Sequence, residues 1–183
     1  MQFFATAVLI FCCVTGVSAE PPSSNRKLQE LKDADQSDRE KGQRNIDWVA
    51  LSKTDIDRQA LVFNILRAGE LRTDTDFYNA ALVFQHGGTP ETSRLAHALA
   101  TVAYQMNNEN KAAKWLSAAS WDRLMMTLKR PQWYATQFTK PHGSDTFVLY
   151  DIDETVVSDE TRKSMGARSV ADARAHAEEL SKK

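Results

Sequence analysis

The sequence predicts an all-α protein, a single domain of antiparallel helix pairs with an ordered aromatic loop and one short extended arm near the C-terminus. Three observations support this prediction. From about residue 55 to 128, apolar residues recur at the spacing of helix faces. Capping residues precede these stripes, and glycines follow two of them. The four-residue link at 107–110 is so short that its flanking helices must run antiparallel.

Residues 1–19 are predicted to be a signal peptide. They contain no charged side chain and end in Val-Ser-Ala, a pattern of small residues that signal peptidases cut. A membrane anchor is the less favoured alternative, because the apolar run is shorter than the ~20 residues that a spanning helix needs. We therefore expect an exported protein, periplasmic or extracellular, with no stable membrane insertion after cleavage.

Composition excludes several kinds of site from the expected mature chain. Both cysteines, Cys12 and Cys13, fall within the predicted signal, which leaves no disulfide, thiol nucleophile or cysteine-bound metal. The 23 basic residues balance 24 acidic ones, so no nucleic-acid partner is predicted. No two histidines have the i, i+4 spacing of a metal site, and no glycine-rich phosphate loop is present. We expect neither a metal nor another cofactor.

The predicted domain organisation follows from where the apolar residues begin. Residues 20–25 start with Glu-Pro-Pro-Ser-Ser and are predicted to form a linker. The helical domain is expected over 26–183, with its core at about 46–138 and a C-terminal arm with helices at 139–183. At its start, Leu28 and Leu31 form one sparse stripe, which predicts an exposed helix over residues 26–39.

Three core helices have recognisable ends. Asp55 or Asp57 caps the first, which ends before Gly69. A threonine or an aspartate near residue 75 caps the second, and Thr89 with Pro90 opens the third. The residues expected to face inward are Leu61, Ile65 and Leu66 in the first helix, Phe77, Ala80, Ala81 and Phe84 in the second, and Leu95, Leu99, Val102 and Met106 in the third.

The helix expected at residues 111–128 is apolar around much of its circumference, which predicts a central position. After it, two prolines, a glycine and three aromatic residues indicate an ordered loop whose Trp133, Tyr134 and Phe138 need burial. Residues 146–152 are predicted to form one short strand or extended arm. A turn of helix capped by Ser158 and a terminal helix complete the chain.

The extended arm contains a motif with a known chemistry. Phe147–Val156, with Asp151 and Asp153 before Thr155, resembles the first motif of haloacid dehalogenase-like phosphatases. That resemblance implies a nucleophilic Asp151, with Asp153 as general acid and base. Such a nucleophile lies in a parallel sheet, where each neighbouring strand needs a crossover of about a dozen residues or more. With its helix such a crossover usually takes about thirty residues, and the 32 residues after Asp151 contain no second apolar strand, so a phosphatase is a remote alternative.

Polar residues in four short stretches are the candidates for a site. Gln85 and His86 lie at a predicted helix end beside two glycines, and Asp122 lies on an apolar helix face, where a carboxylate needs a partner. We predict His86, Asp122 and Arg123 as catalytic residues. The predicted ligand-binding residues are Gln85, Gln132, Tyr134, Thr136 and Gln137. Asp35 and Arg39, spaced by one helical turn, form the fourth stretch.

Each candidate has a structural alternative. Asp122 and Arg123 are more typical of a pair that locks the fold than of catalysis. Gln132 and Gln137 are also suited to satisfying buried backbone groups. Convergence of His86, Asp122, Arg123 and Gln137 on one open pocket would favour a ligand site or an enzyme, and dispersal would favour a scaffold.

Taken together, these stretches resemble an uncharacterised bacterial family known only as a domain of unknown function. In that family the patterns DQxDR, QH, DR, PQxYGTQ and DExR recur, and the resemblance runs from about Asp35 to Leu180. The chain departs from the family at Ala135 and Lys129, where glycine is usual. A glycine at Ala135 would imply a loop that needs positive φ. A weaker, architectural similarity to tetratricopeptide or Sel1-type helix pairs covers about residues 75–127 without a fixed period.

Three functions remain in view. The first is an exported binding module that receives a peptide or small polar ligand on its helix pairs and aromatic loop. The second is a metal-independent hydrolase or transferase with His86 as general base, in which Arg123 and the loop amides hold the substrate. The third is a structural or envelope-associated protein. Whether the protein is an enzyme is left open by the sequence.

Overall fold

The computed structural model describes residues 22–40 and 45–182, so the predicted signal peptide at 1–19 lies outside the described residues. The described part confirms the all-α prediction, with a small antiparallel sheet as its one β element. The elements in chain order are α1 (Arg26–Glu40), α2 (Trp48–Arg67), α3 (Asp74–Gln85), α4 (Pro90–Met106), α5 (Lys111–Thr127), β1 (Phe138–Thr139), β2 (Val148–Leu149), α6 (Asp159–Ser164) and α7 (Val170–Ser181).

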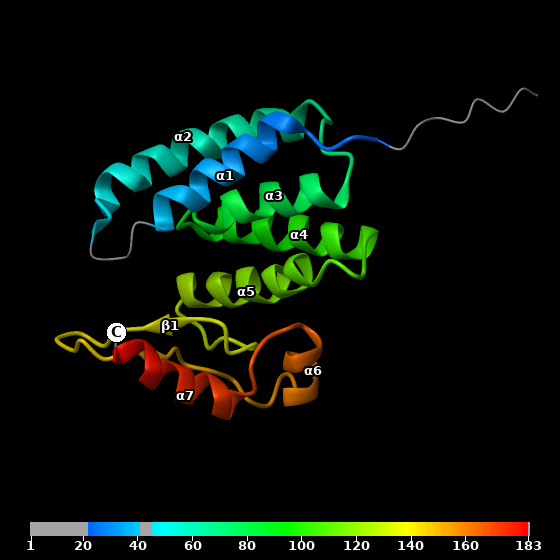
Figure 1. The fold of residues 1–183 in the computed structure, drawn as a ribbon. Helices are drawn as coiled ribbons and strands as arrows, with labels where there is room; N and C mark the ends of the chain where they lie inside the picture. Colours follow the sequence, from blue (N-terminus) through cyan, green and yellow to red (C-terminus); the bar gives the residue numbers. More distant parts are fainter. Residues whose placement is uncertain (1–21, 41–44, 183) are drawn as a thin grey trace, which may run out of the picture.

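The helices form a layered stack. Figure 1 shows α1 and α2 side by side at one end, α3 and α4 beneath them, then α5, and finally the loop with α6 and α7. Consecutive core helices run antiparallel, so α1 and α3 finish at the same end of the stack at which α2 begins (Figure 1). The central position predicted for the helix at 111–128 is confirmed, because α5 contacts α3 and α4 and also carries the loop.

Small residues line the crossings of α3, α4 and α5. Their short side chains let the helix backbones approach closely, which increases van der Waals contact. The buried small residues of this region are Ala80, Ala81, Ser93, Ala96, Ala100, Ala103, Ala113, Ser117, Ala118, Ala119 and Ser120. This packing overturns part of the predicted face of α4. Of the four residues expected inward, Leu99 is buried, but Val102 and Met106 are exposed, since the alanine face turns toward the neighbouring helices.

The helix predicted over residues 26–39 is confirmed as α1, but the prediction that it is exposed was wrong for one face. Leu28 and Leu31 are buried in the same core as α3, and the Asn79 amide of α3 donates to Gln29 of α1 (2.8 Å). The entry into α1 is also fixed, because the Asn25 N–H donates to the Asp76 carboxylate (2.6 Å). Two leucines provide the apolar face of α1 because only one side of this helix contacts α2 and α3, while its other sides face solvent.

The start of α2 and part of its inner face differ from the prediction, although Ile65 and Leu66 pack against the core as expected. Asp47, and neither Asp55 nor Asp57, caps the helix, accepting hydrogen bonds from the N–H groups of residues 49 and 50. The buried residues of α2 are Leu51, Asp55, Arg58 and Val62, whereas Leu61 is exposed. Two of these four are charged and pair with each other, so the apolar residues mark this face only at Leu51 and Val62.

The predicted ends of the other helices are confirmed. Thr73 and Asp76 form a reciprocal capping box at α3, and Thr89 with Thr92 does the same at α4, where Pro90 occupies the first turn. Gly69, just after α2, has φ of 70°, as a left-handed helix terminator does. Ser158 caps α6.

Beyond α5 the chain forms the ordered loop and the short arm. β1 pairs antiparallel with β2, and Gln132 bridges to Ile152. No parallel sheet carries Asp151 in the part of the chain that the structure describes, and the Asp153 carboxylate accepts hydrogen bonds from the Thr155 N–H (3.0 Å) and hydroxyl (2.6 Å). None of the described helices is long and apolar enough to cross a membrane.

Candidate functional site

A fully buried carboxylate, Asp35 on α1, is the centre of the candidate site. Its oxygens accept hydrogen bonds from Arg39 one turn later (2.9 Å), from the Gln36 amide (2.8 Å), and from Nδ1 of His86 (2.9 and 3.2 Å). His86 is the C-cap of α3, so the end of α3 delivers its ring to α1. Three donors, one of them shared between both oxygens, compensate for the desolvation of this carboxylate.

The contact with Asp35 also sets the orientation of the His86 ring. An ionised carboxylate only accepts hydrogen bonds, so Nδ1 is the donor, and in the neutral imidazole Nε2 is then the acceptor nitrogen. The His86 side chain is one-fifth exposed and borders a cavity. A buried acid that fixes the imidazole tautomer in this way is the arrangement found in catalytic dyads and triads.

A second carboxylate extends the network into α2. Asp55 accepts from Arg39 (2.5 Å) and from Arg58 (2.9 Å), and Arg58 also pairs with Asp38 of α1. Asp55 and Arg58 are both buried. Arg39 therefore bridges Asp35 and Asp55, which ties α1 to α2 by charge-assisted hydrogen bonds in a region shielded from water.

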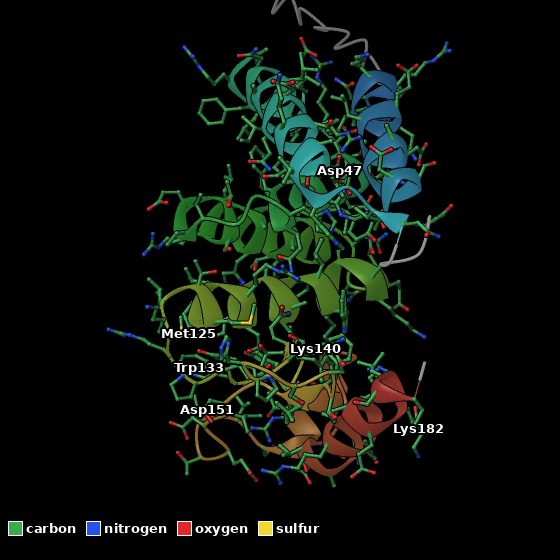
Figure 2. All side chains as sticks on the ribbon, turned by 90° about the vertical axis from the view of Figure 1, so that its left-hand side faces the viewer. Asp47, Met125, Trp133, Lys140, Asp151 and Lys182 are labelled. Carbon is green, nitrogen blue, oxygen red and sulfur yellow. The ribbon has the colours of Figure 1, made fainter. Side chains whose placement is uncertain are left out.

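A cavity of about 190 Å³ opens beside this network. It lies at the end of the stack where α1 and α3 finish and α2 begins, and Figure 2 looks onto this end, with Asp47 marking the start of α2. α1, α2, α5 and the end of α3 all contribute to its wall. The residues lining it are Arg39, Trp48, Leu51, Ser52, Asp55, His86 and Arg123.

Arg123, on α5, is the unusual member of this wall. Its Nε is buried without a hydrogen-bond partner, and no carboxylate of the described residues lies within ion-pair distance of its guanidinium. Burial, and then the positive charge of Arg39, lower the pKa of Arg123 from its ordinary value. Arginine nevertheless stays charged in proteins. Arg123 thus borders the cavity without a direct ion-pair partner among the described residues.

Asp122, the residue before Arg123, serves the loop and not the cavity. It is fully buried and accepts from the N–H groups of Trp133 (2.8 Å), Tyr134 (3.0 Å) and Thr136 (3.1 Å), and from the Thr136 hydroxyl (2.8 Å). Burial raises the pKa of Asp122, and these hydrogen bonds oppose that rise. It forms no ion pair with Arg123, so the expected locking pair is replaced by a carboxylate that anchors a loop.

The two glutamines of the loop satisfy backbone groups. Gln132 donates to the carbonyls of Gln137 (2.9 Å) and Tyr150 (2.9 Å) and accepts from the Gln137 N–H (2.9 Å). Gln137 donates in turn to the carbonyl of Ala119 (3.2 Å). Both side chains are buried, so they join the loop to α5 and to the arm, as their structural alternative predicted.

The arginine of the predicted DExR pattern closes the loop from its other side. Arg162 is buried, donates from Nε to the carbonyl of Trp133 (2.8 Å) and pairs with Asp159 (2.9 Å). Tyr134 and Thr136 are half-buried, and burial raises the pKa of the Tyr134 phenol. All of these contacts hold the loop in one conformation beneath α5. In Figure 2 Trp133 lies below α5, and Asp47 lies far above it at the start of α2.

Two non-glycine residues in this region have positive φ, Lys129 (56°) and Ala135 (59°). They are the two positions at which the resembled family usually has glycine. No other non-glycine residue in 22–40 and 45–182 shows positive φ. The strain expected at Ala135 is therefore present.

The predicted catalytic residues are thus divided between two places. His86 and Arg123 meet at the cavity, Asp122 and the loop residues lie elsewhere, and Gln85 is buried with its Oε1 unpartnered. Trp48, Leu51, Ser52 and Asp55 were missed as site residues. The signal that reveals Asp55 is its position on one helix face with Leu51 and Val62, because a charged residue inside an apolar stripe needs a partner.

No cluster of three or more metal-ligating side chains exists among the residues that the structure describes. The chain matches no protein-family model, and it is not significantly similar to any curated protein or solved structure. The resemblance to the family of unknown function therefore stays a prediction.

Proposed function

We propose that this protein binds a small anionic ligand, a carboxylate or phosphate, in the cavity between α1, α2 and α5. One observation carries the proposal: Arg123 faces the cavity as a half-buried cation without a counter-ion among the described residues. A desolvated, unpaired charge is costly, and a bound anion would remove that cost.

The rest of the wall suits an anion. Arg39 is held rigidly by its bonds to Asp35 and Asp55, so its remaining positive field is fixed in place before any ligand arrives. Both oxygens of Asp55 are already engaged by arginines, which reduces its repulsion of an incoming anion. Planar guanidinium groups match the geometry of carboxylates and phosphates.

The proposal keeps the predicted binding module but moves its site from the aromatic loop to the cavity. Export directed by residues 1–19 remains part of it, on the strength of the sequence alone. Membership of the resembled family is supported by one observation, the positive φ at Lys129 and Ala135, where that family uses glycine. No reaction follows from that membership.

Binding is tested by thermal shift and calorimetry of the purified protein with inorganic phosphate, sulfate, acetate and citrate. A ligand of the native state raises Tm by mass action, and we expect a saturable rise with at least one of these anions. Arg123→Gln should abolish it. Arg130→Gln, which removes the same charge from an exposed position just after α5, is the matched control and should leave it intact.

The same variants separate a built site from general salt effects. Because Arg123 has no partner to lose, Arg123→Gln should fold normally and be at least as stable as the wild type without ligand. Equal loss of the anion response in Arg123→Gln and Arg130→Gln, or no saturable response in the wild type, would contradict the proposal.

A hydrolase or transferase is the second candidate, favoured by the 2.9 Å contact between Asp35 and His86 Nδ1. In that function Nε2 takes a proton from water as the water attacks a bound ester, and the imidazolium returns the proton to the leaving oxygen. Such a base contributes about 10²–10⁴ in rate. Hydrolysis of p-nitrophenyl acetate and p-nitrophenyl phosphate should fall by that factor in His86→Gln, and equal rates for the two proteins would exclude the role.

A further inference from the structure

Trp48 is the least expected residue of the cavity wall. It is 55% exposed, although tryptophan is among the side chains that gain most from burial. It occupies the first position of α2, directly after the capping residue Asp47, so its backbone is fixed by the cap. It borders the same cavity as Arg123 and Arg39. An exposed indole beside two guanidinium groups offers an apolar face next to an anion site.

Trp48 is separate from the other exposed apolar residues of α2. Val49, Ile56 and Phe63 recur every seven residues and form an outer stripe on this helix. At about 100° per residue, Trp48 lies about 60–100° around the helix from that stripe, on the side of the buried residues Leu51 and Asp55. The exposure of Trp48 therefore belongs to the cavity and not to the outer stripe.

The size of the cavity bears on what it would hold. At ~30 Å³ per water molecule, 190 Å³ corresponds to about six waters, so a bare oxyanion would leave much of the space to water. The same volume lies below the ~300–1,000 Å³ of sites for drug-sized ligands. A ligand with one ring attached to one anionic group fits between these limits.

We propose that the ligand is an aromatic anion, whose ring stacks on Trp48 while its carboxylate or phosphate is held by Arg123 and Arg39. This inference rests on the proposed anion site. The choice of an aromatic ring over a sugar follows from the wall. Arg39 and Asp55 already bond to each other, so two of the polar lining residues are engaged before any ligand arrives. A sugar needs several free hydrogen-bond partners, whereas an aromatic ring needs the apolar face that Trp48 offers.

The test compares four phosphates that share one anionic group: inorganic phosphate, phenyl phosphate, cyclohexyl phosphate and glucose 6-phosphate. Calorimetry with the purified protein should show phenyl phosphate binding about tenfold more tightly than inorganic phosphate, the size of one aromatic contact. Cyclohexyl phosphate, with a ring of similar size but no π face, should gain less. Glucose 6-phosphate should bind no better than inorganic phosphate.

Trp48→Ala isolates the ring contact. It should reduce the affinity for phenyl phosphate toward that for inorganic phosphate, and far-UV circular dichroism shows whether the variant is folded. Trp115→Ala is the matched control, because Trp115 is 41% exposed on α5 and does not border the cavity. It should have no effect on either ligand.

The outcomes separate this inference from the proposed function. If inorganic phosphate binds through Arg123 but phenyl phosphate gains nothing, the aromatic ligand is refuted and the anion site stands. An equal gain for glucose 6-phosphate, or an equal loss of both ligands in Trp48→Ala, would also overturn the aromatic assignment. If the wild type binds none of the four phosphates, this inference fails, and the proposed function fails with it when sulfate, acetate and citrate also give no saturable response.

Discussion

Replacing Lys129 by glycine should stabilise the protein. Lys129 follows α5 with φ of 56°, and its N–H donates to the Met126 carbonyl (3.0 Å) while the Arg130 N–H donates to the Met125 carbonyl (2.9 Å), the paired bonds of a Schellman motif. A left-handed conformation costs a non-glycine residue about 1–2 kcal/mol. Glycine removes that cost, but it loses more backbone freedom on folding, which lowers stability by about 0.5–1 kcal/mol. Lys129 is exposed, so no buried contact is lost.

The expected gain for Lys129→Gly is therefore about 0.5–1 kcal/mol in the free energy of unfolding. Urea denaturation followed by far-UV circular dichroism measures it, with an unchanged slope as the sign of an unchanged unfolding transition. Ala135→Gly relieves the same strain, but it also removes a buried methyl group, whose burial stabilises the fold by about 0.8 kcal/mol. Its net effect on the free energy of unfolding should therefore be near zero.

Arg130→Gly is the matched control, because Arg130 is the next exposed residue and lacks positive φ. It should lower stability by about 0.5–1 kcal/mol, since glycine then adds entropy and relieves no strain. Equal destabilisation by Lys129→Gly and Arg130→Gly would refute the argument that the end of α5 stores backbone strain.

Three further predictions concern other parts of the fold. Asp122→Ala should lower the free energy of unfolding by about 3 kcal/mol or more in urea denaturation, because three backbone N–H groups lose their acceptor at ~1–3 kcal/mol each. Gly87→Ala should cost about 1–3 kcal/mol in the same assay, because a Cβ there would lie 2.4 Å from the Thr92 side chain; an unchanged midpoint would show that α4 yields freely. The pKa of the Asp159 carboxyl, measured by NMR, should lie below its ordinary value, because Arg162 and the Val170 N–H donate hydrogen bonds to it. The ionised carboxylate therefore stabilises the fold at pH values above the unfolded-state pKa, and this stabilisation is lost as the pH falls through the folded-state pKa. An ordinary Asp159 pKa, unchanged in Arg162→Lys, would contradict this.

The helix ends and the ordered loop could be predicted because residues close together in the sequence determine them. Thr89 and Ser158 cap helices because a side-chain oxygen satisfies N–H groups two or three residues away, which a sequence displays directly. The loop between α5 and the arm was predicted to be ordered because its aromatic residues need burial. The caps were predicted from neighbouring residues along the chain. The ordered loop was predicted from its content of aromatic residues, which are unfavourable in water.

The first two helices were harder to predict, because their inner faces depend on partners from distant segments. Asp35 and Asp55 are buried charges, and burial is acceptable there only because Arg39 and His86 arrive from other positions and elements. The cavity has the same origin. His86 and Arg123 were both candidates, but nothing in their separation along the chain indicates that α3 and α5 end beside each other.

The adjacency of Asp122 and Arg123 on α5 has a consequence for how this chain can change. Successive residues on a helix project about 100° apart, so one side chain reaches down to the loop and the next reaches the cavity. A single-residue insertion earlier in α5 would rotate Asp122 and Arg123 together by about 100°. Asp122 would then lose its hydrogen bonds to the loop, and the Arg123 guanidinium would leave the cavity. The register of one helix thus couples two distant surfaces, and lineages of this protein should vary in the length of their termini and loops long before they vary in the length of α5.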